Sequence, residues 1–451
     1  MNDKPILALL LATALLLSNL AVPTVAAETE HKEKGIYGSV RLTETEYRAI
    51  ETSGEMHDQF QRRGMLHSDR ALEAWLQEIG NRLVPEPTDS YQEYRFYLIR
   101  DPSPNAFALP NGRIYVHTGL ICRLENEAQL AFLLAHEINH VAGHHGILAY
   151  RSYKKKAVLG NIISVLGALA GGWGELGGYL MNYGLATSVF GYSRDLEQEA
   201  DVKGYALMLN AGYDVREMPA LFEILGEDFE GLNPRMHGKW RSHPDLMLRG
   251  QYTAALAADT AQERLARLSL GSDDFRSRAR PLALETVRDY ILNDYPKTAL
   301  ELAKDLIEED PEYAAGWVAQ GHAYIALGAT SEYSVEVQLT RKEKKARVKL
   351  RSKLTRDELR AQAENSPQAE ANIEHNYAEA ENSYRVALEL DKAEAEAHAG
   401  LGEIYLRREM YRESARELVT YIRLRPDAPD KSIVMDDLRE IAQILKSESG
   451  E

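Results

Sequence analysis

The chain contains one short motif that could carry catalysis, His-Glu-Ile-Asn-His at residues 136–140. It lies in an apolar run, residues 127–143, with no proline and no glycine before its last residue, so the pattern predicts a helix. On a helix, His136 and His140 would be one turn apart on the same face, where both imidazoles can bind one metal ion. Glu137 would lie close enough to act on water held by that metal. The alternative is a pair of half-buried helix histidines that bind nothing.

A third ligand can be sought downstream, because catalytic zinc usually has three protein ligands and a water. The run Ser-Arg-Asp-Leu-Glu-Gln-Glu-Ala-Asp at residues 193–201 is compatible with a second helix. Glu197 and Asp201 are four residues apart, so both can face the first helix. Asp195 and Glu199 point to other faces of this helix and are the competing candidates.

The two motifs together, His-Glu-x-x-His and Ser-Arg-x-x-Glu-x-x-Ala-Asp, resemble the zinc metallopeptidase family that includes HtpX, the CAAX prenyl protease and BepA-type enzymes. The resemblance implies one zinc ion per chain, held by His136, His140 and Glu197. It also implies that Asp201 steers one of these ligands from behind. The expected reaction is peptide hydrolysis, in which Glu137 removes the proton of the zinc-bound water and returns it to the leaving amine.

A predicted β-hairpin precedes the metal helix, because an Asn-Gly pair at residues 111–112 separates two alternating runs. The second run, with Ile114, Tyr115 and Val116, resembles a strand of the same family. We expect a free edge of this strand to pair with an extended peptide and to fix the scissile carbonyl over the metal. The other interpretation is an ordinary core strand. The two interpretations are compatible, because peptide binding requires only that one edge of the strand be free.

A His-Pro pair followed by an arginine, His243 and Arg249, also recurs in the family. In its BepA-type members this histidine can reach the zinc and displace the water, which implies a self-inhibiting switch at His243. It could instead stabilise the transition state or be an ordinary loop histidine. Arg249 is expected to pair with an acid near the metal. His144 and His145 do not have the spacing of a third ligand, and we expect both to be structural.

The first 27 residues have the features of a cleaved secretory signal peptide: a lysine, an apolar run and small residues at 25–27. An uncleaved anchor is the alternative. The segment 157–192 is rich in glycine and almost uncharged. It is expected to form a covered helical hairpin or lid beside the site, and the alternatives are contact with a membrane surface or a membrane span.

The remaining chain divides into two predicted domains, a peptidase domain at residues 28–265 and a helical repeat domain at 279–446. Small residues, tyrosines and closing prolines in the second domain fit about three tetratricopeptide (TPR) repeats, which would bind a protein partner. A charged insert near 329–374 interrupts them and contains the basic run 341–360. This run could meet a membrane surface or an acidic partner, although a solvated helix or loop is the simpler interpretation.

The predicted fold class is therefore mainly α: an α+β zincin core with a small β-sheet, followed by a TPR α-solenoid. A net charge of −16 makes nucleic acid a poor partner. We expect an exported zinc-dependent endopeptidase. The resemblance implies a periplasmic protease and chaperone in outer-membrane protein assembly and quality control, with polypeptide substrates that could be unfolded outer-membrane proteins. The alternatives are a TPR-based chaperone or adaptor whose zinc site is silent or self-inhibited, and a small-molecule metallohydrolase.

Overall fold

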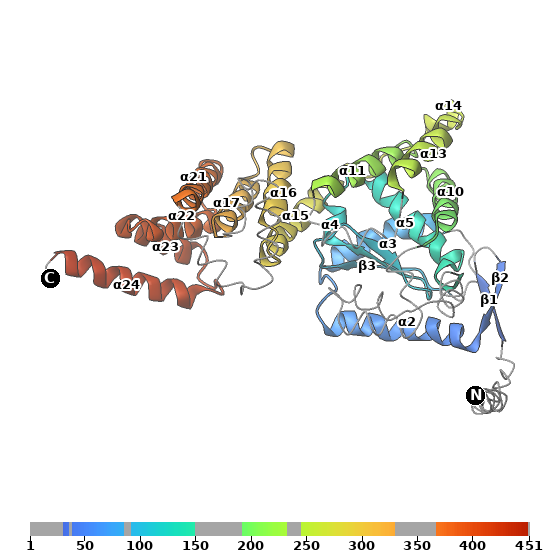
Figure 1. Cartoon of the computed structure of the whole chain (residues 1–451), viewed down its shortest axis with the longest axis horizontal. Coiled ribbons are helices and arrows are strands. Elements are labelled where there is room, and N and C mark those ends of the chain that lie inside the picture. The colour runs from blue at the N-terminus through green and yellow to red at the C-terminus, as the bar shows by residue number, and fades with distance from the viewer. Residues whose placement is uncertain are drawn as a thin grey trace, which may run out of the picture.

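The computed structural model describes residues 30–35, 38–84, 92–148, 192–231, 245–329 and 367–449. The predicted signal peptide, the glycine-rich segment up to residue 191, His243 and the basic run 341–360 lie outside these ranges. In Figure 1, a sheet with its surrounding helices forms one part of the molecule, and an array of helices that ends at α24 forms the other. The described chain is mainly helical with a small sheet, which confirms the predicted fold class.

The sheet has three strands, β3 (Arg95–Ile99), β4 (Ala106–Ala108) and β5 (Arg113–His117). Their order is β3-β5-β4, and β5 runs parallel to β3 and antiparallel to β4. The β4–β5 turn passes through Gly112, whose φ of 96° lies in the left-handed region. A Cβ atom there would also lie 2.6 Å from the carbonyl oxygen of Glu93, so glycine is required at this position. The predicted hairpin is confirmed.

The alternation of side chains along β5 divides the core into two layers. Ile114 and Val116 face helices α3 (Arg70–Leu83) and α5 (Glu127–Ala142). Tyr115 faces the opposite side, where Met56 and Phe60 of α2 (Glu44–Arg62) cover the sheet. A two-stranded hairpin, β1 (Glu30–Gly35) and β2 (Gly38–Thr43), precedes α2. The sheet is therefore covered on both faces, and α5 lies in its larger core layer (Figure 1).

Helix α5 is the most enclosed element of this part, because all sixteen of its residues are buried. It begins at Asn126, whose side chain accepts a hydrogen bond from the backbone N–H of Gln129 at 3.0 Å, and it ends at Gly143. Helix α10 (Arg194–Ala211) packs against it. At the crossing, a Cβ atom on Gly204 would lie 3.4 Å from the backbone nitrogen of His136. The glycine allows the two metal-motif helices to approach closely.

The other helices of this part are α4 (Thr118–Ile121), α11 (Glu217–Gly231), α13 (Leu246–Ala258) and α14 (Gln262–Leu265). Those of the helical array are α15 (Phe275–Leu292), α16 (Pro296–Glu309), α17 (Ala314–Ala329), α21 (Pro367–Leu390), α22 (Ala395–Arg407), α23 (Tyr411–Leu424) and α24 (Lys431–Ser449). In the array, the ring of Tyr384 fills the space that Gly321 and Gly400 leave open on two neighbouring helices.

Helix α15 packs in both parts of the molecule. Its Phe275 contacts Trp75 of α3, with ring centroids 5.6 Å apart. Its Tyr290 hydroxyl donates a hydrogen bond of 2.5 Å to the carbonyl oxygen of Pro102. Other residues of α15 pack against α16 and α17, so one hydrophobic core extends from the sheet into the array.

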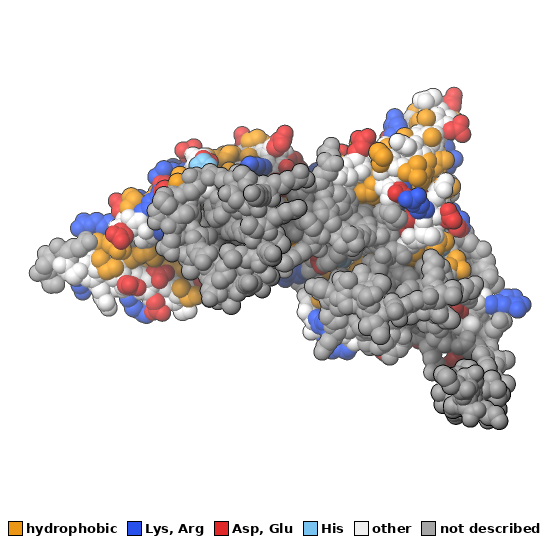
Figure 2. Space-filling view, viewed as in Figure 1, with side chains coloured by type: hydrophobic (Ala, Val, Ile, Leu, Met, Phe, Trp, Pro, Cys, Tyr) orange, Lys and Arg blue, Asp and Glu red, His pale blue; other side chains and the backbone are white. Residues whose placement is uncertain are grey.

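The surface carries charges of both signs on the face that Figure 2 shows, with apolar side chains gathered over α11 and α13. Met247 and Leu248 of α13 are among the exposed apolar residues. Within the described ranges, no helix combines the length and the apolar character needed to cross a membrane.

Candidate metal centre

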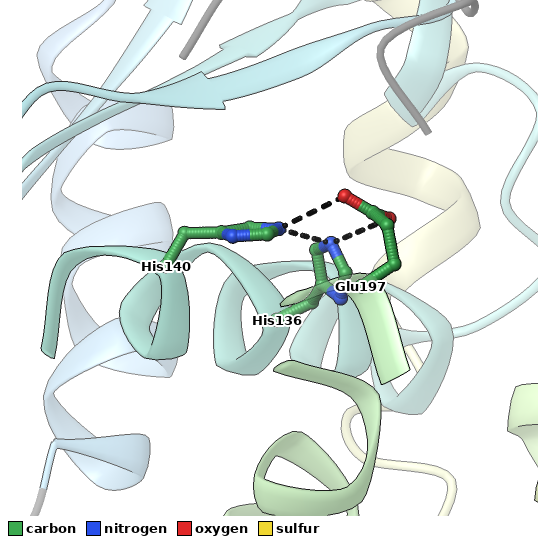
Figure 3. A group of neighbouring side chains, drawn as sticks. All are labelled: His136, His140 and Glu197. Atoms are coloured by element: carbon green, nitrogen blue, oxygen red, sulfur yellow. Dashed lines mark hydrogen bonds and ion pairs between the residues drawn. The ribbon is translucent and has the colours of Figure 1, made fainter. Parts of the chain in front are cut away.

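Three side chains from α5 and α10 converge on one point, as Figure 3 shows for His136, His140 and Glu197. The two histidine Nε2 atoms are 2.9 Å apart. The carboxylate oxygens of Glu197 lie 3.6 Å from Nε2 of His136 and 3.4 Å from Nε2 of His140. Each of these residues is at most 3% exposed. Two imidazoles and one carboxylate form a ligand set that catalytic zinc uses, so these residues fit a metal ion.

Asp201 contacts His136 on the side that faces away from the point of convergence, and Arg249 contacts Glu197. Nδ1 of His136 lies 2.8 Å from Oδ1 of Asp201, an arrangement in which Nδ1 carries the hydrogen and Nε2 keeps its lone pair for a metal. The guanidinium of Arg249 donates to both carboxylate oxygens of Asp201, at 2.7 and 2.8 Å. It also lies 2.9 Å from Glu197, and the hydroxyl of Tyr252 donates to Asp201.

The charges in this cluster set the protonation states of Asp201 and Arg249. Burial alone would raise the pKa of Asp201, but the charge of Arg249 and the hydrogen bond with His136 outweigh it and hold that pKa well below its usual range. Burial would lower the pKa of Arg249, but Asp201 and Glu197 outweigh that effect and raise it. Asp201 is therefore a carboxylate at neutral pH and Arg249 a cation. With Glu197 ionised, the three groups carry one net negative charge, which favours a bound cation.

His140 has a different environment. The ring of Tyr192 stacks on it, with centroids 3.8 Å apart and planes at 12°. Its Nδ1 lies 2.9 Å from Nδ1 of His145, which is also buried. Burial, followed by the charge of nearby His136, lowers the pKa of His140 well below its usual value. Burial is also the main cause that lowers the pKa of His145, to about 4. Both imidazoles are thus neutral at pH 7.

Glu137 is 3% exposed and lines a hollow together with His136. The other walls of this hollow are Ala106, Phe132, Leu133, Phe222, Leu225 and Arg249. A second hollow, beside His140 and Tyr192, is bordered by Ala108, Leu109 and Pro110. Strand β4 therefore extends from one hollow to the other, past His136 and His140.

The prediction that Ile114, Tyr115 and Val116 present a free strand edge is wrong. These residues lie in the central strand β5, where they pair with β3 on one side and with β4 on the other, and all three are fully buried. The hairpin places β4 outside β5, and β3, an earlier segment, occupies the remaining edge. The strand that lies at the sheet edge beside α5 is β4.

Of the other candidate site residues, Arg249 lies at the site, whereas Asp195 and Glu199 lie on the surface. The structure places Arg249 beside the candidate metal ligands, where it pairs with Glu197 and Asp201. Asp195 and Glu199 are exposed, and Glu199 pairs with Lys203. Tyr192 and Tyr252 also contact the site, although the sequence did not predict either of them. A signal existed for Tyr252, because it follows Arg249 by three residues and so shares a helix face with it. No comparable pattern marks Tyr192.

Comparison with known proteins agrees with this geometry. Residues 70–255, which include the three converging ligands, match the model of Peptidase family M48. The beta-barrel assembly-enhancing protease of Escherichia coli is 28% identical over 273 residues, which cover 57% of this chain and 50% of that protein. The mitochondrial metalloendopeptidase OMA1 of Schizosaccharomyces pombe is 31% identical over 163 residues, 35% of this chain and 45% of that protein.

A third relative, the mitochondrial metalloendopeptidase OMA1 of Bos taurus, is 28% identical over 221 residues, 40% of this chain and 39% of that protein. The chain thus spans half or less of the length of these relatives. The match confirms the resemblance drawn from the two helix motifs. The region from residue 70 to residue 255 belongs to Peptidase family M48.

Proposed function

We propose that this protein is an exported zinc-dependent endopeptidase of the periplasm, whose substrates are unfolded outer-membrane proteins. The observation that carries the proposal is the buried convergence of His136, His140 and Glu197 beside Glu137. The relatives named as proteases support the reaction, and the name of the Escherichia coli relative supports the substrate class.

The residues of the site have separate roles in this proposal. A zinc ion held by His136, His140 and Glu197 would polarise the scissile carbonyl and lower the pKa of a water molecule. Glu137 accepts the proton of the attacking water and delivers it to the leaving amine. Its burial keeps bulk water away from this proton transfer. Arg249 keeps the carboxylate of Glu197 in place.

Substrate positioning is assigned to β4. An extended peptide that pairs with this edge strand would lie along both hollows, with its scissile bond close to Glu137. The hollow on the Glu137 side has the apolar walls Phe132, Leu133, Phe222 and Leu225. We therefore propose that an apolar side chain next to the scissile bond is preferred.

The remaining assignments extend the same proposal. The helical array of residues 279–446 would act as TPR-like repeats that bind a protein partner, beside a peptidase domain at 28–265. His243 would close or assist the site. The glycine-rich segment 157–192 would cover the site or touch a membrane surface.

A cleavage assay tests the proposal. The purified chain is incubated with a denatured outer-membrane β-barrel protein, beside Glu137→Gln and the control Asp195→Asn, an exposed carboxylate of α10, and the zinc content of each is measured. We expect one zinc per chain in all three proteins, with cleavage by the native chain and by Asp195→Asn only. Retained cleavage by Glu137→Gln would overturn the role of the base.

Two other results of this assay would contradict the proposed endopeptidase function or the metal site. Zinc in all three proteins without cleavage by any of them would favour a chaperone with a silent site, and His243→Ala would then show whether the switch causes the silence. Absence of zinc from the native chain would overturn the metal site.

A further inference from the structure

His145 lies just beyond the C-terminal end of α5 and is 1% exposed. Its ring meets the ring of His140 at an angle of 75°, with centroids 4.9 Å apart, and the two Nδ1 atoms are 2.9 Å apart. Its Nε2 lies 3.7 Å from the carboxylate of Glu199. His145 therefore contacts the candidate ligand His140 at its Nδ1 atom. The other ring nitrogen of His140, Nε2, faces His136 and Glu197.

The position of the hydrogen in this contact follows from the use of His140. Two ring nitrogens at 2.9 Å can form a hydrogen bond only if one donates and the other accepts. Nε2 of His140 is the atom that faces Glu197 and His136, so it must keep its lone pair to bind a metal. Neutral His140 then carries its hydrogen on Nδ1 and donates it to His145. His145 must accept through Nδ1 and carry its own hydrogen on Nε2, toward Glu199.

The rings are also confined sterically. Tyr192 covers one face of His140 and meets His145 at an angle of 65°, with centroids 6.1 Å apart. A Cβ atom on Gly143 would lie 2.4 Å from Nε2 of His145, so the absence of a side chain at that position makes room for the imidazole. The contact between His140 and His145 is thus built into the packing around the end of α5.

We propose that His145 is a positioning residue that sets the tautomer and ring orientation of His140, and this inference rests on the proposed metal site. The two histidine ligands are then supported differently. His136 is backed by a carboxylate, Asp201, whereas His140 is backed by a neutral imidazole. Loss of a hydrogen-bond partner behind a metal ligand typically lowers metal affinity by about 10–100-fold. The same range is expected when His145 can no longer accept a hydrogen bond.

Two variants of the full chain separate hydrogen bonding from packing. His145→Asn can place its amide oxygen where Nδ1 of His145 accepts, whereas His145→Phe keeps an aromatic ring without an acceptor. Zinc affinity is measured by competition with a chromophoric chelator, and the ligand field by the visible spectrum of the Co²⁺ form. Thermal unfolding of the metal-free proteins shows that each variant is folded.

We expect His145→Phe to bind zinc about 10–100-fold more weakly and to alter the Co²⁺ spectrum, while His145→Asn stays within a few-fold of the native affinity. Native zinc affinity in folded His145→Phe would overturn the inference. Equal losses in the two variants would also overturn it, because packing would then be the cause. Tight zinc binding without proteolysis, in both the native chain and His243→Ala, would refute the proposed function and leave this test of His145 intact.

Discussion

Replacement of Arg249 by methionine is expected to destabilise the metal-free protein strongly. Arg249 is 5% exposed, and its guanidinium lies within 3 Å of two buried carboxylates, Asp201 and Glu197. Methionine fills part of the same space but carries no charge. Both carboxylates would then lose the cation that compensates their burial.

The expected size follows from buried ion pairs in general. Removal of one partner from such a pair costs about 3–5 kcal/mol of unfolding free energy, because an uncompensated buried charge remains. For a domain of about 150–250 residues, each kcal/mol lowers the melting temperature by about 2–4 °C. The variant should therefore melt about 6–20 °C below the native chain at pH 7.

The effect should depend on pH in a defined direction. In the native fold the pKa of Asp201 is held below its usual value, so its contribution to stability is present above the unfolded pKa of about 3.9 and is lost as pH falls through the folded pKa. Without Arg249, burial would raise the pKa of Asp201, and its charge would destabilise the fold above about pH 4. The difference in melting temperature between native and variant should therefore narrow as the pH falls through about 4.

The assay is thermal unfolding followed by circular dichroism in the presence of a chelator. Arg249→Met is compared with the double variant Arg249→Met/Asp201→Asn, which should recover part of the loss because one of the two uncompensated charges is gone. A fall of less than about 3 °C at pH 7 would refute the reasoning, given the scale of about 2–4 °C per kcal/mol. So would a double variant that is no more stable than the single one.

Three further predictions concern metal binding and packing. Addition of zinc at about 1,000 times its dissociation constant should stabilise the fold by about 4 kcal/mol, and a melting temperature that zinc does not change would contradict the metal site. Gly204→Val should lower zinc affinity, because overpacking of about 1–3 kcal/mol where α10 meets His136 would separate the two ligand helices; chelator competition measures this, and unchanged affinity would refute it. Gly400→Ala should cost about 1–3 kcal/mol in denaturant unfolding, because its Cβ would lie 2.3 Å from the ring of Tyr384. Zinc affinity should stay native in that variant, and a loss would show that the array shapes the metal site.

The sequence predicted what depends on local spacing. The four-residue separation of His136 and His140 on an uninterrupted apolar run places both on one face of α5. The same spacing in α10 brings Glu197 to His136 and His140, and Asp201 behind His136. Helical periodicity is fixed by backbone geometry, so these relations hold before any tertiary contact is known.

The pairing of strands could not be predicted in the same way. Alternation in residues 113–117 indicates a strand, but the number of its neighbours depends on whether an earlier segment joins the sheet. Because β3 pairs with one edge of β5, β4 is the strand that lies at the other edge of the described sheet. The contact of Tyr192 with His140 joins two segments that packing brings together. His145 reaches His140 because the chain turns after α5 at His144, whose φ is 53°, so helical periodicity predicts neither contact.

Helix α15 belongs to a hydrophobic core that extends through both parts of the molecule. This shared core limits where the chain can be cut into separately folding pieces. The region that matches family M48 ends at residue 255. Phe275 and Tyr290 of α15 follow that limit, yet Phe275 packs on Trp75 and Tyr290 is hydrogen-bonded to Pro102, both inside the region. A truncated protein that ends before α15 would expose this apolar surface to water and would be prone to aggregate. The unit that can be expressed alone, or exchanged between proteins by recombination, is therefore larger than the recognisable family region and includes α15.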